Sequence, residues 1–178
     1  GGPIEPVLEA LDAARACGDP RALAEALSLS CHALFTPHRI AERRGLADEL
    51  VQVASEAGAD LLGLMGLCWR TADLFQTGDP AALPALEDLR QRATALACQN
   101  ILYVVGCMDV MLLVREGRLE EAEALAHDCF KLGDAVGEVD AVAYLSSHML
   151  VVRWLQGRDA ELADMAEEVA SSPTLRKD

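Results

Sequence analysis

The sequence predicts an all-α fold, a right-handed solenoid of four antiparallel helix pairs of about 40 residues each, followed by a C-terminal helix. Three observations lead to this prediction. Residues suited to end helices recur at this period, small residues recur in register with them, and the composition favours packed helices. Such a period is typical of proteins that stack one supersecondary unit on the next.

Two series of positions mark the expected helix ends. Gly78, Gly117 and Gly157 each follow an apolar stretch and lie one repeat period apart. A second series lies between them at the same period and consists of Gly18, Gly58, Cys98 and Gly137. Glycine is common just after a helix because it adopts the left-handed conformation at little cost. We therefore expect a helix to end at each position.

Small and bulky residues recur at the same period inside the expected helices. In the first helix of each pair, the small column is Ala13, Val53, Ala93 and Gly133. In the second helix it is Ala26, Gly66, Gly106 and Ser146. Small side chains let helices approach closely, so we expect the two helices of each pair to cross there. A bulkier column, expected to pack each pair on the next, consists of Leu34, Leu74, Val114 and Trp154.

These signals predict nine helices within one domain at 1–172. The helices are expected at 6–17, 21–35, 40–57, 60–77, 83–97, 100–116, 119–136, 140–156 and 159–171. The repeats are expected at 6–38, 40–78, 83–117 and 119–157, with a terminal helix at 159–171 and a tail at 173–178. The terminal helix is either a cap or the first helix of a fifth repeat. All seven prolines lie near helix starts or in connections. None lies inside an expected helix, where a proline would remove a backbone hydrogen bond and break the helix.

Composition and charge narrow the class of protein. The chain is 52% hydrophobic but only 4% aromatic, so Leu, Ala and Val must fill the core, which suits helices. No apolar run spans a bilayer and no signal peptide is visible, so we expect a cytoplasmic protein without membrane contact. The chain begins without Met, and we expect it to be part of a longer protein. Its net charge of −14 disfavours direct binding of nucleic acid.

The sequence indicates neither catalysis nor a cofactor. It contains no G-x-S-x-G, H-E-x-x-H or G-x-x-x-x-G-K-[ST] motif. None of its four histidines has a second ligand at metal spacing on its own helix, so no metal site is expected. The six cysteines form no C-x-x-C pair and are expected to be reduced and mostly buried: Cys17, Cys31, Cys68, Cys98, Cys107 and Cys129.

A polar seam in the second helices is the main candidate site. Trp69 and Asp109 share one column of the repeat, with three polar residues beside it: Arg70, Asp73 and His148. A buried carboxylate needs a partner, and Arg70 or His148 is the candidate partner of Asp109. The functional interpretation is a ligand-binding cluster between helix pairs. The alternatives are an ion pair that fixes the stacking, which we favour, or exposure of Asp109 to water.

Two further groups have two interpretations each. Tyr103 and Tyr144 lie near the starts of successive second helices and either line a groove or, as we favour, pack in the core. Arg39, Arg43 and Arg44 form a basic cluster at the expected start of the third helix. We expect a solvated helix start there, and docking of an acidic partner is the alternative.

One stretch resembles a known repeat family. Residues 117–126 read G-R-L-E-E-A-E-A-L-A and resemble the tetratricopeptide phrase G-R-x-x-E-A-x-x-x-A, although the tetratricopeptide unit is shorter than this repeat. Together with Trp69-Arg70 and Gly78-Asp79, the stretch resembles the helical-repeat regions of large bacterial ATP-binding transcriptional regulators, of the LuxR/MalT type and the activator-domain-containing type. In those proteins the repeat region senses an inducer or holds protein contacts, while the ATPase and DNA-binding modules lie elsewhere.

The resemblance implies a non-catalytic module that binds a protein or a ligand. Its expected partners are other domains of the parent chain, another protein or a small-molecule inducer. The alternative is a structural module that forms a homodimer or docks a neighbouring domain without a ligand. An apolar face near 6–35 or 159–171 would favour this alternative, since truncated solenoids cover such faces by self-association.

Overall fold

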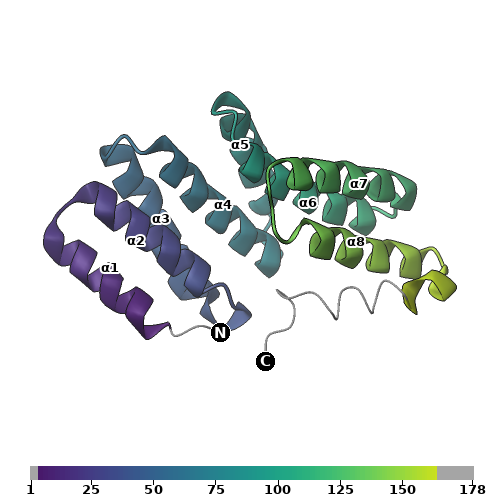
Figure 1. Cartoon of the computed structure of the whole chain (residues 1–178), viewed down its shortest axis with the longest axis horizontal. Coiled ribbons are helices and arrows are strands. Elements are labelled where there is room, and N and C mark those ends of the chain that lie inside the picture. Colours follow the sequence, from purple (N-terminus) through teal and green to yellow (C-terminus); the bar gives the residue numbers. More distant parts are fainter. Residues whose placement is uncertain (1–3, 164–178) are drawn as a thin grey trace. The chain divides into compact units, whose positions relative to one another are not determined.

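The computed structural model describes residues 4–163, and the regular structure in this range is entirely helical (Figure 1). The all-α prediction is therefore confirmed. The α-helices are α1 (Glu5–Cys17), α2 (Pro20–Ala33), α3 (Ile40–Glu56), α4 (Asp60–Thr77), α5 (Ala82–Ala95), α6 (Gln99–Arg115), α7 (Leu119–Ala135) and α8 (Ala141–Leu155). Two short 3-10 turns accompany them, η1 (Pro37–Arg39) and η2 (Asp159–Glu161). Each of these α-helices lies where the repeat predicts one.

The helix ends follow the predicted series with one exception. Gly18 and Gly78 follow α1 and α4 with φ of 74° and 66°, the left-handed conformation that favours glycine. In the third pair the prediction of Cys98 is wrong by one position. Ala97 takes the left-handed conformation there, with φ of 49°, and it is the one non-glycine residue within 4–163 that does so. The predicted helix 159–171 starts as η2, and its residues from 164 onward lie outside the described residues.

The chain divides into two compact units, Gly1–Cys98 and Gln99–Asp178. The division falls between α5 and α6, inside the predicted third repeat, and each unit is described by itself. In the first unit α2 packs on α1 and α3, α3 packs on α4, and α4 packs on α5. One core cluster joins the first three helices and consists of Leu11, Ala24, Leu27, Leu50 and Ala54.

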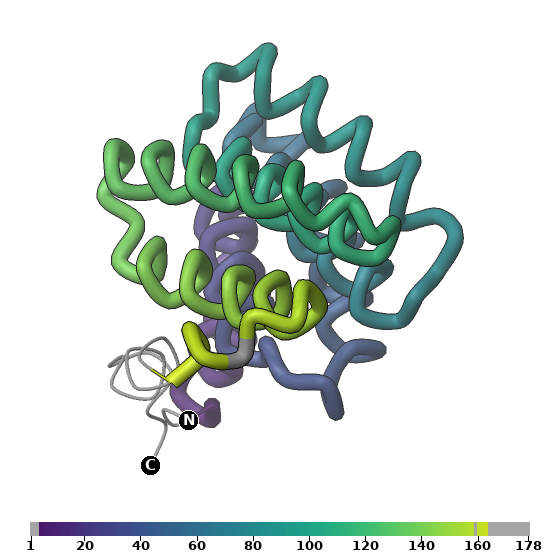
Figure 2. The backbone as a smooth tube through the Cα atoms, turned by 90° about the vertical axis from the view of Figure 1, so that its right-hand side faces the viewer, coloured from purple at the N-terminus to yellow at the C-terminus, as the bar shows by residue number. Residues whose placement is uncertain are grey.

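The second unit is built from α6, α7 and α8, which lie side by side (Figure 2). Its core cluster consists of Tyr103, Cys107, Val110, Ala122, Ala126, Cys129, Met149 and Val152. The side of each helix that contributes to these clusters is thus buried by its neighbours, because a single helix cannot bury its own apolar side.

The small columns mark close helix contacts. A Cβ atom added to Gly66 would lie 2.8 Å from Val51 Cγ2 and 3.1 Å from the Ala47 carbonyl oxygen, so α4 crosses α3 there, as predicted. A Cβ atom on Gly106 would lie 2.6 Å from the sulfur of Cys129. Gly106 therefore packs on α7, the first helix of the next pair, and the predicted crossing of α6 with α5 stays a prediction.

The apolar helices bury most of the cysteines. Cys31, Cys68, Cys107 and Cys129 are buried, and all six cysteines are free thiols. Burial raises the pKa of Cys31 and of Cys68 to about 12, so these thiols stay protonated at neutral pH. Within residues 4–163, no helix combines the length and the apolar character that crossing a membrane requires.

Candidate functional site

The structure divides the predicted polar seam between the two units. Arg70 lies on α4, half-exposed, and pairs with the carboxylate of Asp48 on α3 at 3.6 Å. Asp109 is half-buried on α6, and His148 is 9% exposed on α8. Arg70 thus has a partner, Asp48, within its own unit, and the pairing of Arg70 with Asp109 stays a prediction.

Asp73 belongs to a buried ion pair with Arg43, which the sequence analysis did not foresee. Both side chains are 0% exposed, and two guanidinium nitrogens of Arg43, Nε at 2.9 Å and Nη2, donate to Asp73 Oδ1. The prediction that Arg43 lies in a solvated basic cluster is therefore wrong. Two charges fully removed from water are tolerated only because they are paired and hydrogen-bonded.

Further contacts of Arg43 show what the pair does. Its Nη1 donates to the Leu34 carbonyl oxygen at 2.7 Å, and Nη2 donates to Gln76 Oε1 at 3.3 Å. The guanidinium also lies over the ring of Phe35, 4.7 Å from the centroid. Arg43 thus joins the end of α2, its own helix α3 and the last turn of α4. Since neither charge is exposed, we interpret the pair as a structural link and not as a ligand site.

The aromatic candidates form two separate contacts. Trp69 is half-buried on α4, with the rings of His32 and Phe35 at 5.8 Å and 5.4 Å. In the second unit, the rings of Tyr103 and Tyr144 lie 6.1 Å apart, edge to face. Tyr103 is a core residue, 3% exposed, and burial raises its pKa. The preferred interpretation of Tyr103, packing in the core, agrees with this placement, whereas Tyr144 is 46% exposed.

Buried His148 makes the stability of the second unit depend on pH. Its ring lies 6.3 Å from that of Tyr144, and burial lowers its pKa below the ordinary 6.5. The unfolded chain, with a pKa of about 6.5, then binds the proton more readily than the folded chain. Stability contributed by neutral His148 is therefore present above about pH 6.5 and is lost as the pH falls toward the folded pKa.

We expect His148→Gln to flatten this loss of stability on acidification, because glutamine does not titrate. Urea unfolding at several pH values between about 5 and 8 measures the slope. The control is His127→Gln, an exposed histidine on α7, which should keep the slope of the unchanged protein. An unchanged slope in His148→Gln would contradict the prediction.

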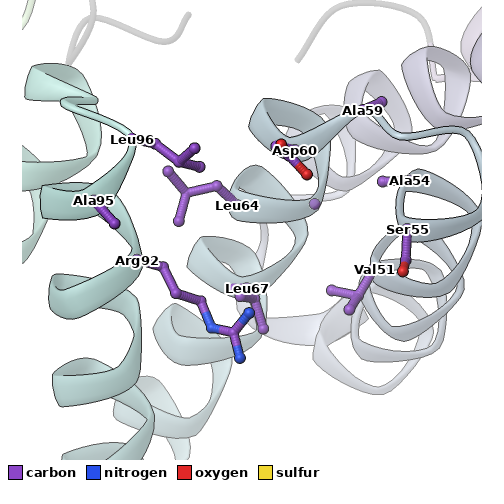
Figure 3. A pocket seen from close by; sticks show the side chains of 11 residues that line it. Val51, Ala54, Ser55, Ala59, Asp60, Leu64, Leu67, Arg92, Ala95 and Leu96 are labelled. Carbon is purple, nitrogen blue, oxygen red and sulfur yellow. The ribbon is translucent and has the colours of Figure 1, made fainter.

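A groove in the first unit is a candidate binding site. It lies between α3, α4 and α5 and has a volume of about 400 Å³. Figure 3 shows Leu64 of α4 and Leu96, which follows α5, pointing toward each other across it. The complete lining is Val51, Ala54, Ser55, Ala59, Asp60, Gly63, Leu64, Leu67, Arg92, Ala95 and Leu96. We call this site the α4–α5 groove.

The polar groups of the α4–α5 groove are few. Arg92 is held by the Asp88 carboxylate, whose two oxygens accept from its Nε at 2.9 Å and 3.0 Å. Asp60 lies in the first turn of α4, where the helix dipole favours a negative charge. A second hollow of about 260 Å³ shares Leu67 and is lined by Arg70, Thr71, Leu74, Ala81, Ala85 and Asp88. Arg70 is thus the one residue of the predicted seam that lines a hollow beside the groove.

Sequence reasoning missed the groove itself. Its lining comes from three helices, and alanine, leucine and glycine in helices carry no sequence signal of a site. An apolar wall with a few polar groups is the kind of lining that fits an apolar ligand. Among the described residues, no three His, Cys, Asp or Glu side chains are grouped so that they could hold a metal ion.

The fold and the groove together define a broad class: a helical repeat-like all-α protein with an apolar groove between helices. Comparison with known proteins adds no narrower class. No protein-family model matches the chain, and no curated protein matches it.

Proposed function

We propose that this chain is a non-catalytic helical-repeat module that binds a ligand or a protein segment in the α4–α5 groove. In this proposal the helix pairs stack as a right-handed tetratricopeptide-like solenoid, and the module belongs to a bacterial transcriptional or signalling regulator. Binding would be transmitted as a change in the stacking of the pairs. The existence of the groove is the single observation that carries the proposal.

The volume and lining of the groove support binding. About 400 Å³ lies within the range of roughly 300–1,000 Å³ that is typical of small-molecule sites. Half-buried Leu67 and exposed Leu96 supply apolar surface whose burial favours binding by about 25 cal/mol per Å². An apolar ligand, or an apolar side chain of a partner protein, therefore fits this site best.

Charge narrows the class of ligand. Arg92 is already neutralised by Asp88, whereas Asp60 contributes a carboxylate to the lining. The chain as a whole carries −14. Anionic ligands are repelled by this field, so we propose a neutral or basic apolar ligand.

Filling the groove should abolish binding of an apolar probe. Ala95 is exposed on α5 and lines the groove, so Ala95→Trp places a large side chain in it without disturbing buried packing. We expect the affinity for Nile red, a neutral apolar fluorophore, to fall at least tenfold in a fluorescence titration. Native mass spectrometry of the unchanged protein tests in addition for a co-purified small molecule, which Ala95→Trp should lose.

The matched control is Ala41→Trp, the same change at an exposed position of α3 outside the groove. It should bind Nile red as the unchanged protein does. Equal affinity of both variants would place the Nile red site elsewhere and refute binding in the α4–α5 groove.

A second candidate function is a structural module that dimerises or docks a neighbour without a ligand. A specific observation favours it: the second unit exposes an uncharged apolar helix face, formed by Tyr144, Val151, Trp154 and Leu155, which is independent of the groove.

A further inference from the structure

Two buried cysteines of the second unit lie beside each other on neighbouring helices. Cys107 on α6 and Cys129 on α7 belong to the same core cluster and are 4% and 6% exposed. A hydrogen bond joins their side chains. Both are free thiols, so the structure shows this pair in its reduced form.

Gly106 explains how the two thiols come together. A Cβ atom at this position would lie 2.6 Å from the sulfur of Cys129, closer than real side chains approach. Because glycine lacks that atom, the side chain of Cys129 reaches the backbone of α6 directly beside Cys107. Two cysteines can form a disulfide only where their backbones come within about 7 Å, and a close helix contact of this kind favours such an approach.

The hydrogen bond makes the two thiols chemically unequal. Cys107 donates to Cys129, and this lowers the pKa of the Cys129 thiol, although burial and the charges of Asp109 and Asp128 act against it. The same hydrogen bond, together with burial, raises the pKa of the Cys107 thiol. The thiolate is the form that oxidants attack, so Cys129 is the thiol that reacts first, and Cys107 lies next to it.

The buried cysteines of the first unit have a different environment. Burial raises the pKa of Cys31 and of Cys68 to about 12, which keeps both thiols protonated. Cys31 donates to the Arg43 carbonyl oxygen at 3.9 Å. The charge of Cys98 adds to the rise in the pKa of Cys68, so Cys68 and Cys98 are the rival pair for disulfide formation.

We infer that Cys107 and Cys129 form an oxidation site, at which a peroxide converts the two thiols into a disulfide bond between α6 and α7 and a thiol reductant reverses the change. The inference goes beyond the proposed function and does not depend on it, because the α4–α5 groove lies in the first unit.

The reaction takes place in two steps. The Cys129 thiolate attacks one oxygen of hydrogen peroxide and the O–O bond breaks. The hydroxide that leaves takes up the proton lost by Cys129, which gives one water and a sulfenic acid on Cys129. The sulfur of Cys107 then attacks the sulfenic sulfur, so that the S–S bond forms and the S–O bond breaks. The hydroxyl group leaves with the proton of Cys107 as a second water, so both sulfurs are oxidised and the peroxide is reduced.

Burial selects a small oxidant for this site. Hydrogen peroxide is little larger than water and can reach a buried sulfur through local opening of the helices. A bulky thiol reagent should instead modify exposed Cys17 and half-buried Cys98 first.

Peroxide oxidation of the folded full chain tests the inference. Free thiols are then blocked with iodoacetamide in denaturant, and the chain is digested with trypsin and chymotrypsin, which cuts after Tyr103 and so separates Cys98 from Cys107. Mass spectrometry of the unreduced digest should show Cys107 joined to Cys129 as the predominant cross-link, and reduction should remove it. A cross-link of Cys68 with Cys98 in its place, sulfinic acid without a disulfide, or thiols that stay unmodified would each overturn the inference.

Three variants and one condition serve as controls. Cys107→Ala and Cys129→Ala should each abolish the cross-link, whereas Cys17→Ala, at an exposed position of α1, should keep it. Circular dichroism checks that each variant is folded. In urea the unchanged chain keeps its sequence but loses its packing, so its cross-links should spread over several pairs. An equal preference for Cys107 with Cys129 in urea would show that the fold does not create the site.

Discussion

Replacement of Arg43 by alanine is expected to lower the free energy of unfolding by about 3–5 kcal/mol. The substitution leaves the Asp73 carboxylate charged, fully buried and without its partner, and it also removes the donor to the Leu34 carbonyl oxygen. An uncompensated buried charge is among the most destabilising changes that a single substitution can make. Urea unfolding followed by circular dichroism measures the loss.

Two comparisons isolate the buried charge as the cause. Arg39→Ala removes a surface pair with Glu42, at 3.2 Å and about half-exposed, and should cost less than about 1 kcal/mol. The double variant Arg43→Met with Asp73→Leu removes both charges and should be more stable than Arg43→Ala. If Arg43→Ala costs no more than Arg39→Ala, the pair does not have the structural role given to it here.

Substitution of two glycines on α4 by alanine is expected to have opposite effects. Gly66→Ala should destabilise by about 2 kcal/mol, because the new Cβ lies 2.8 Å from Val51 Cγ2 and 3.1 Å from a backbone oxygen, neither of which can move freely. Gly63→Ala should stabilise by about 0.5–1 kcal/mol, because its Cβ would make an ordinary 3.6 Å contact with Ala54 and alanine is the better helix former. Thermal and urea unfolding of both variants measure the difference, and an equal effect at the two sites would disprove the close crossing at Gly66.

Much of the helical pattern could be read from the sequence because its determinants are local. A glycine that follows an apolar stretch can end a helix because its own backbone adopts the left-handed conformation at little cost. A proline is kept out of helix interiors because its ring clashes with the preceding turn and it lacks an N–H group. The one misplaced end, at Ala97, shows the limit of this reasoning. There a residue with a Cβ adopts the left-handed conformation, with φ of 49°, and the glycine that follows six of the other helices is absent.

The buried pair shows why the candidate site was harder to predict. Arg43 lies on the same side of α3 as Ala47, Leu50 and Ala54, all of which are buried. The helical spacing of these residues could therefore have predicted that Arg43 is buried. The partner of Arg43 could not be predicted from the sequence, because Asp73 is 30 residues away on another helix. The helical period of a sequence predicts on which side of a helix a charged side chain lies. Only the packing of two helices decides which oppositely charged side chain it contacts.

The sequence by itself determined where the described helices lie, nearly all of their ends and the buried side of most of them, because these follow from backbone preferences and from periodicity. Only the tertiary structure decided that Gly106 packs on α7, that Arg43 pairs with Asp73, that α3, α4 and α5 leave a groove, and that Trp154 on α8 is exposed. The physical reason is that packing joins residues far apart in the chain through shape and distance. Neither quantity is encoded in any single stretch of sequence.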